Sequence, residues 1–148
     1  MSVHGVELPA WECLELLRSR PVGRICVVDH GYPIAIPVNY EVVGTNNSLQ
    51  VVVRTAPETI LGRYEGLGSL EVDDIALDTG TAWSVIVRGT LHRVLGAHEL
   101  ADPNPLIDSD RQRWVTLQMS AITGRRFTVR QDEESGTVDW QESERSSE

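Results

Sequence analysis

An arginine stands at the end of a short apolar stretch of this sequence, in a position where it could hold an anion. Residues 49–54 include three consecutive valines, which are typical of a buried β-strand. Thr55 and Glu58 follow at the spacing of a capping box, which predicts a helix directly after the strand. Arg54 would then lie beside the unpaired N–H groups of a helix N-terminus, an arrangement suited to phosphate. The alternative is an ordinary capped helix next to a surface arginine.

The cations of this chain belong to one residue type. All 13 basic residues are arginine, and lysine is absent. Schiff-base chemistry, a lysine general base and a P-loop lysine are therefore excluded. Any bound anion must be held by arginine side chains and the backbone.

The acidic charge is concentrated at the C-terminal end. The net charge of −9 disfavours nucleic acid as a partner, because that binding needs clustered cations. Residues 132–148 hold seven acids and one arginine, a balance of −6. We expect one domain over residues 1–131 and an acidic, disordered tail over residues 132–148, in which Val138 and Trp140 are able to anchor the chain locally.

Neither a membrane segment nor a metal site is predicted. No apolar run approaches the roughly 18 residues of a membrane span, and no signal peptide is recognised, so we expect a cytoplasmic protein without a membrane partner. Cys13 and Cys26 lack metal spacing and are expected to be buried, reduced thiols. The histidines lack the spacing of a helical metal pair, and Asp73, Asp74 and Asp78 are interpreted as solvated acids.

Hydrophobic periodicity indicates a chain dominated by strands. A helical pattern covers residues 8–20, a turn is built on Gly31, and a polar connection with one helical turn is expected within residues 96–112. Strands are expected over residues 22–28, 34–43, 49–54, 69–75, 82–95, 113–118 and 124–130, with a second helix over about 56–65. Seven strands without βαβ alternation predict an antiparallel barrel, because closure removes exposed sheet edges.

Two residues interrupt the strand patterns. Pro37 cannot donate to a strand ladder, so it is expected at an edge, at a bulge or where the backbone turns toward something else. Gly89 is expected to bend the long strand over residues 82–95.

Several short motifs occur in an order that resembles the pyridoxamine 5′-phosphate oxidase-like, FMN-binding split-barrel family. They are residues 21–25, residues 31–40 with Gly-Tyr-Pro and Pro-Val-Asn-Tyr, residues 53–55, and residues 83–89. Residues 114–115 with 122–126 are similar to the closing segment of the actinobacterial flavin or deazaflavin branch. The resemblance covers about residues 8–130.

The resemblance implies a six- to seven-stranded antiparallel split β-barrel with two or three short helices. It also implies a homodimer with flavin sites between the subunits. Arg54 and Thr55 would contact the phosphate of the flavin. Val38 and Asn39 would line its ring, and Trp83 and Ser84 would approach it. For Trp83, packing in the core or in a dimer interface stays an open alternative.

Two residues depart from the pattern of this family. A small residue often stands where Glu58 is, and a phosphate-binding lysine stands near Ile60. Losing a cation removes a charge-assisted bond of ~1.5–3 kcal/mol, and Glu58 would repel a phosphate. Arg63, one turn further along the expected helix, is a candidate replacement for the missing cation.

These observations lead to one functional expectation and two alternatives. We expect an FMN-dependent oxidoreductase acting on a small molecule that the sequence does not identify, with no catalytic side chain assigned. A reductase that uses the deazaflavin F420 is one alternative. The other is a split-barrel binding or regulatory protein with weak or no flavin binding, which Glu58 and Ile60 favour. The absence of a Gly-x-Ser-x-Gly motif disfavours a hydrolase.

Overall fold

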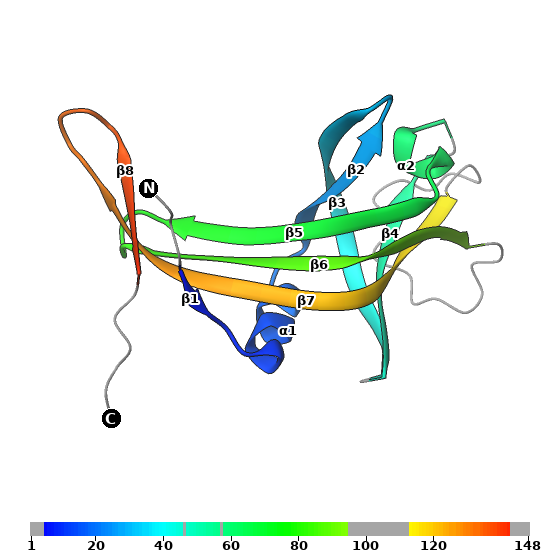
Figure 1. Ribbon diagram of the computed structural model, residues 1–148, viewed down its shortest axis with the longest axis horizontal. Coiled ribbons are helices and arrows are strands. Elements are labelled where there is room, and N and C mark those ends of the chain that lie inside the picture. The colour runs from blue at the N-terminus through cyan, green and yellow to red at the C-terminus, as the bar shows by residue number, and fades with distance from the viewer. Residues whose placement is uncertain (1–4, 46, 57, 95–112, 143–148) are drawn as a thin grey trace.

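The chain folds into a β-barrel from which a long sheet extends (Figure 1). A computed structural model describes residues 5–45, 47–56, 58–94 and 113–142. The barrel strands are β2 (Val22–Asp29), β3 (Tyr32–Thr45), β4 (Ser48–Thr55), β5 (Gly66–Ala76), β6 (Thr81–Val94) and β7 (Arg113–Gln131). They pair antiparallel in the order β7-β4-β3-β2-β5-β6, and β6 pairs back to β7. The mainly β, antiparallel split barrel predicted from the sequence is confirmed.

Strands β5, β6 and β7 continue beyond the barrel as a three-stranded sheet (Figure 1). The outer edge of β7 is covered in succession by three other strands. β4 pairs with residues 113–118, β1 (Val6–Glu7) with Arg125 and Arg126, and β8 (Val138–Glu142) with residues 127–131. The first and last strands that the structure describes therefore meet on one strand edge.

β7 is a single strand of 19 residues, where the sequence predicted two. Residues 119 and 121–123 continue the pairing with β6, and a register shift between Arg88 and Gly89 leaves Ser120 without a partner on that strand. A Cβ on Gly89 would lie 1.8 Å from the carbonyl oxygen of Gln118, so this close strand approach requires glycine. The irregularity predicted at Gly89 is confirmed. The prediction of two strands was wrong because a β-bulge, rather than a loop, accommodates this segment.

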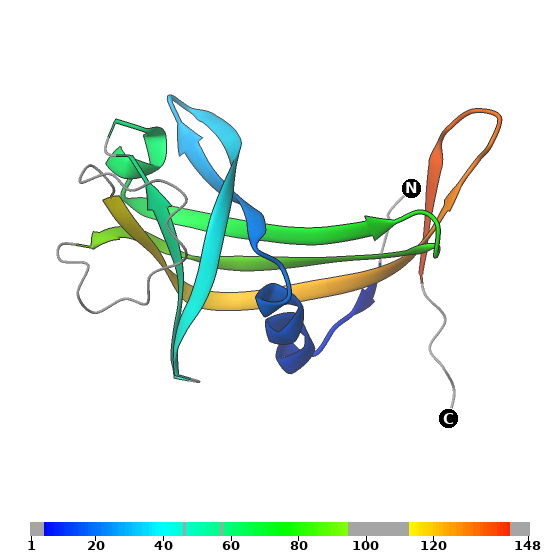
Figure 2. The same cartoon turned by 180° about the vertical axis from the view of Figure 1, so that it is seen from behind.

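Helix α1 (Ala10–Arg18) packs against the extended sheet beside the barrel (Figure 2). Two ion pairs hold this region to the sheet. Glu12 of α1 lies 2.7 Å from Arg126 of β7, and Arg20, two residues beyond the helix, pairs with Asp74 of β5. The helix is therefore fixed to two of the three long strands by charge as well as by its apolar face.

The core is formed by aliphatic side chains that alternate along the barrel strands. It continues under α1, where Leu17 is fully buried. Members with no measurable exposure include Ile25, Val51, Leu70, Val85, Val87 and Leu117. Cys13 is buried as predicted, whereas Cys26 is only half-buried, and neither forms a disulfide.

The second helix is shorter and begins later than the sequence predicted. α2 covers only Ile60–Arg63, and its N-cap is Thr59, whose hydroxyl accepts a hydrogen bond from the N–H of Gly62 at 3.1 Å. Thr55 instead ends β4, and Glu58 lies before the helix. The predicted capping box of Thr55 and Glu58 is therefore wrong, because Thr59 supplies a competing cap one turn later.

Beyond β7 the structure differs from the expected tail. Residues 132–142 form a turn and β8, in which the ring of Trp140 meets Phe127 edge-on with centroids 5.4 Å apart. Residues 143–148 lie outside the described residues, as does the whole connection expected over residues 96–112. The domain boundary expected at residue 131 stays a prediction. No helix in the described ranges is long and apolar enough to cross a membrane.

Candidate functional site

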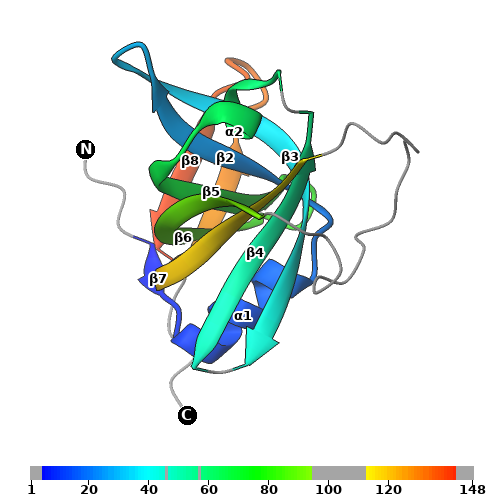
Figure 3. The same ribbon diagram turned by 90° about the vertical axis from the view of Figure 1, so that its right-hand side faces the viewer.

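The barrel opens where β3 and β4 separate (Figure 3). The pairing of these strands ends at Tyr40 and Val53, so Asn39 and Arg54 are the first residues beyond the shared ladder. From Tyr32 to Asn39, β3 pairs only with β2. Pro37 therefore lies on an open strand edge, which confirms one of the three positions expected for it. This open edge offers backbone groups to a ligand.

One residue beside the opening is held firmly by the core. Tyr40 is 7% exposed, and its hydroxyl donates a hydrogen bond to the carbonyl oxygen of Leu17 at the end of α1. Burial raises the pKa of Tyr40 to about 12, so its hydroxyl remains a donor over the physiological range. Asn39 directly precedes Tyr40, so this hydrogen bond also fixes the position of Asn39 relative to α1.

Three arginines and two threonines gather where β4 leads into α2, and we call this group the arginine corner. Its members are Arg54, Thr55, Thr59, Arg63 and Arg113. The hydroxyls of Thr55 and Thr59 lie 2.6 Å apart. Arg63 donates from Nε to the carbonyl oxygen of Thr59 at 3.3 Å, and Arg113, which pairs with Thr55 in the sheet, donates from Nη1 to the carbonyl oxygen of Gly62 at 2.6 Å.

The side chain of Arg54 is positioned by an aromatic neighbour. Its guanidinium carbon lies 4.6 Å from the ring centroid of Trp114, the residue paired with it on β7. Stacking of this kind orients the plane of a guanidinium. The corner therefore groups three arginines on a chain whose net charge is −9.

The two departures from the family pattern also lie at this corner. Glu58 is exposed on the segment between β4 and α2, and it does not take the N3 position of the helix. Ile60 is half-buried and packs against the core, so it supplies no cation. Arg63 and Arg113 bring two guanidinium groups to the same corner, in addition to Arg54.

The four other predicted site residues do not share one face of the sheet. Val38 packs against the core, whereas the next side chain, Asn39, is exposed. Trp83 likewise belongs to the core, and Ser84 is directed to the opposite face by strand alternation. Strand β6, which carries Trp83 and Ser84, is separated from β3 by β2 and β5 in the ring. A single chain therefore does not bring these four side chains together with Arg54 and Thr55.

Trp83 is largely covered within the chain. It is 8% exposed, and its neighbours across the strands are Asp74 of β5 and Arg126 of β7. Asp74 pairs with Arg20, and Arg126 pairs with Glu12. The guanidinium carbon of Arg20 also lies 5.8 Å from the ring centroid of Trp83. In one chain the ring thus contributes to the packing of α1 on the sheet.

A carboxyl pair lies on the outer face of β5. One guanidinium nitrogen of Arg24 is 3.3 Å from both Glu71 and Asp73. Burial, reinforced by the hydrogen bond and charge of Asp73, raises the pKa of Glu71 to about 7. The pair can therefore hold a proton close to neutral pH. Within the described residues, no cluster of His, Cys, Asp and Glu is placed to hold a metal ion.

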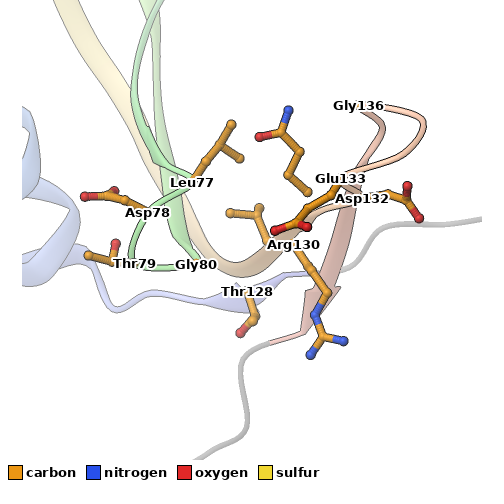
Figure 4. A pocket seen from close by; sticks show the side chains of 11 residues that line it. Leu77, Asp78, Thr79, Gly80, Thr128, Arg130, Asp132, Glu133 and Gly136 are labelled. Atoms are coloured by element: carbon orange, nitrogen blue, oxygen red, sulfur yellow. The ribbon is translucent and has the colours of Figure 1, made fainter.

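A cavity of about 690 Å³ lies at the far end of the extended sheet, remote from the barrel opening (Figure 4). It lies between the β5–β6 turn, with Asp78 and Thr79, and the turn before β8, with Asp132 and Glu133, and the carboxylates of Asp78 and Asp132 point away from each other (Figure 4). The carboxylate of Asp132 accepts hydrogen bonds from the backbone N–H groups of Glu134 and Ser135, and these lower its pKa. This cavity contains none of the predicted site residues and is polar and open, so we do not assign the site to it.

Sequence reasoning identified part of the arginine corner and missed the rest. Arg54 and Thr55 were predicted from the strand that they end, and Arg63 was named as a replacement cation. Thr59 and Arg113 were not identified. The signal for Thr59 was its hydroxyl three residues before Gly62, but Arg113 required the register between β4 and β7, which no local pattern reports.

The closed ring of six antiparallel strands, open beside a cationic corner, defines the class of split-barrel proteins. Residues 9–131 match the family described as pyridoxamine 5′-phosphate oxidase. This chain therefore belongs to the pyridoxamine 5′-phosphate oxidase family. A search of the curated proteins returned no match.

Solved structures of related proteins agree with this assignment. An FAD-binding protein from Mycobacterium smegmatis is 32% identical with a TM-score of 0.67, over 83% of this chain and 98% of that one. A putative pyridoxamine 5′-phosphate oxidase from Corynebacterium glutamicum is 29% identical with a TM-score of 0.66, over 83% and 93% of the two chains. An FAD-binding protein from Mesorhizobium loti, 18% identical with a TM-score of 0.63 over 82% and 95%, shares the fold.

Proposed function

We propose that this protein is a flavin-dependent oxidoreductase that holds the phosphate of its flavin at the arginine corner. The observation that carries the proposal is the position of Arg63 and Arg113, whose guanidinium groups hydrogen-bond the backbone of the segment that follows Thr55, with Arg54 next to Thr55 at the end of β4. Guanidinium groups are donors suited to phosphate, so the arginines present fit this group. The FAD-binding relative from M. smegmatis supports the same ligand class.

The flavin would carry out the redox chemistry, and the protein would bind and orient it. A bound flavin supplies hydride transfer to or from a small-molecule substrate. Arg54 and Thr55 would hold the phosphate, and the open edge of β3 at Val38 and Asn39 would line the ring. We infer a cytoplasmic location, which the two unpaired cysteines support.

We propose FMN as the flavin, on the basis of the resemblance seen in the sequence. The related protein from M. smegmatis binds FAD, which makes FAD the first competitor, and F420 is the second. The extra phosphate of FAD, or the acidic tail of F420, would add negative charge that Arg63 and Arg113 could meet. The three cofactors are therefore distinguished by affinity rather than by the presence of a cationic corner.

We also propose that the active form is a homodimer. Within one chain, Trp83 and Ser84 are separated from Asn39 by two strands of the ring. They pair with the part of β7 around Arg126, whereas Arg54 pairs with Trp114 near its other end. A second copy could place its own Trp83 and Ser84 beside the corner and complete the site. Light scattering after size exclusion should then give twice the mass of the chain, and a monomer at micromolar concentration would remove this part of the proposal.

Titration of the purified protein with FMN, FAD and F420, followed by visible absorbance, tests the central proposal. We expect saturable spectral changes with at least one of the three and the highest affinity for FMN. Reduction of the bound cofactor by borohydride should be reversible in air if it serves redox chemistry. A protein that remains colourless with all three cofactors would overturn the proposed function.

A split-barrel binding or regulatory protein with little affinity for flavin is the second candidate. The exposed carboxylate of Glu58 beside the corner is the observation that favours it, because it opposes a phosphate. Glu58→Gln should strengthen FMN binding several-fold if the corner is a flavin site. Glu15→Gln, which neutralises an exposed acid on α1, should have no effect. Equal, negligible FMN affinity in both variants would support the regulatory alternative.

A further inference from the structure

A second concave site lies on the outer face of the barrel, at the β-bulge between β6 and β7. It has a volume of about 470 Å³ and shares no residue with the arginine corner. Ligand pockets for small molecules are typically of roughly 300–1,000 Å³, mostly apolar, with a few polar groups that fix orientation. We call it the bulge pocket, and it has an apolar wall and a polar wall.

The apolar wall is formed by three neighbouring strands. Val28 of β2 pairs with Pro33 of β3, and Leu67 of β5 lines the same pocket. Leu67 is 78% exposed and Val28 is 56% exposed. Exposed apolar side chains that gather around a concavity, rather than being scattered singly, mark a binding surface.

The polar wall is formed by the bulge itself. Arg88, Gly89 and Ser120 lie at the register shift between β6 and β7 and line the pocket. Arg88 lies opposite Ala121 and Gly89 opposite Met119, so Ser120 is the extra residue of the bulge, and Arg88 lies beside it. In the part of the chain that the structure describes, Arg88 makes no hydrogen bond and no ion pair. An uncompensated arginine beside an apolar wall is suited to an oxyanion attached to an apolar body.

We propose that the bulge pocket binds a small amphipathic anion, with its apolar body on Val28, Pro33 and Leu67 and its carboxylate on Arg88. The charges favour this ligand over a second copy of the chain. Glu71 and Asp73, which follow Leu67 and Ser69 on the same face of β5, already pair with Arg24. A symmetric interface through the pocket would therefore bury a second Arg88 rather than supply a carboxylate for the first.

Two fluorescent probes that differ by one anionic group test the proposal on the purified full chain without added flavin. 8-Anilinonaphthalene-1-sulfonate carries a sulfonate, and N-phenyl-1-naphthylamine is the same aromatic body without it. We expect the sulfonate probe to bind with one site per chain and more tightly than the neutral probe. Decanoate should displace it, and decanol should do so less effectively.

Matched variants assign the binding to the pocket. Arg88→Gln should weaken the sulfonate probe about tenfold or more and leave the neutral probe unchanged, because only the charge-assisted bonds are lost. Leu67→Ser should weaken both probes. Arg18→Gln, which removes an exposed arginine on α1, should change neither, and circular dichroism should confirm that every variant is folded.

Three results would overturn the proposal. One is equal affinity of the wild-type chain for the two probes, and another is unchanged sulfonate affinity in Arg88→Gln. The third is a shift from dimer to monomer in Leu67→Ser together with no probe binding to the wild-type dimer, which would show that a second copy covers the pocket. Since no flavin is added, failure here leaves the flavin titration of the arginine corner unaffected.

Discussion

At the scale of single residues, the partners of the arginines decide which of them can hold an anion. Four of them are paired with carboxylates: Arg20, Arg24, Arg93 and Arg126. Arg63 and Arg113 instead donate to backbone carbonyl oxygens, which carry no formal charge. These contacts do not neutralise the positive charges of Arg63 and Arg113, so both guanidinium groups can attract a phosphate.

Arg54→Ala should weaken flavin binding at least tenfold. It removes a charge-assisted bond of ~1.5–3 kcal/mol, and ~1.4 kcal/mol corresponds to a factor of ten. Visible-absorbance titration of the wild-type chain and the variant provides the measurement. Arg18→Ala, on an exposed part of α1, is the matched control. Unchanged affinity in Arg54→Ala would remove Arg54 from the site.

Glu71→Gln should change how stability depends on pH. The folded pKa of Glu71 is raised to about 7 from 4.5, so the folded chain binds this proton more tightly than the unfolded chain. Its contribution to stability is therefore fully present below pH 4.5 and is lost as the pH rises through 7. Urea unfolding of the variant at pH 8 should show a gain on the order of 1 kcal/mol, limited by loss of the pair with Arg24.

The control for this prediction is urea unfolding of the wild-type chain and of Glu71→Gln at pH 4.5. There the carboxyl of Glu71 in the folded wild-type chain is protonated and resembles the amide, so the two free energies of unfolding should nearly coincide. A difference that is the same at both pH values would show that Glu71 does not titrate near neutrality.

Whether a residue of the candidate flavin site could be predicted from the sequence depended on whether its signal was local. Arg54 and Thr55 were identifiable because they end a strand of conspicuous composition, and strand composition is local information. Asn39 and Val38 were named together, yet strand alternation sends them to opposite faces. Arg113 reaches the corner only through its pairing with Thr55, a contact between segments far apart in the sequence.

At the scale of elements, the sequence predicted the turn between β2 and β3 but did not predict the irregular pairing of β7. The turn between β2 and β3 was predicted from the presence of Gly31. In the structure Gly31 has a φ of 81°, a conformation that favours glycine. β7 was predicted as two strands, over residues 113–118 and 124–130, because no local pattern in residues 119–123 indicates a bulge. α2 was placed too early because Thr55 and Thr59 both have the chemistry of an N-cap, and only tertiary packing selects between them.

Gly89→Ala should destabilise the fold more than Gly68→Ala. The added methyl group at Gly89 would meet the backbone carbonyl of Gln118 at 1.8 Å, which cannot move without breaking the bulge. At Gly68 the closest atom, at 2.6 Å, is the end of the Leu91 side chain, which can shift. We expect a loss of about 2 kcal/mol or more for Gly89→Ala in urea unfolding. Equal losses would show that the bulge tolerates a side chain.

At the scale of the whole molecule, the barrel and the extended sheet have separate supports. The barrel is closed by the pairing of β6 with β7, whereas the extension depends on α1, β1 and β8 packed on or beside the same strands. The arginine corner and the bulge pocket both belong to the barrel half. Changes at the far end of the extension are therefore expected to affect stability or association before they affect binding.

A chain that ends at residue 131 tests this separation. Without β8, the edge of β7 over residues 127–131 would be unpaired and Phe127 would lose its contact with Trp140. Exposed strand edges pair with other chains, so we expect concentration-dependent association in analytical ultracentrifugation, with flavin affinity unchanged. A truncated chain that behaves as the full chain does would show that β8 adds nothing to the fold and would support a domain boundary at 131.

The meeting of β1 and β8 on β7 has a consequence for the order of folding during synthesis. Strands β2, β3 and β4 leave the ribosome early and can form their hairpins at once, but β7 must emerge before the ring can close. β1, made first of all the described strands, must wait until Arg125 and Arg126 appear before it has a partner. Contacts of such high sequence separation slow folding, so the nascent chain should expose its strand edges until nearly all of it has been translated.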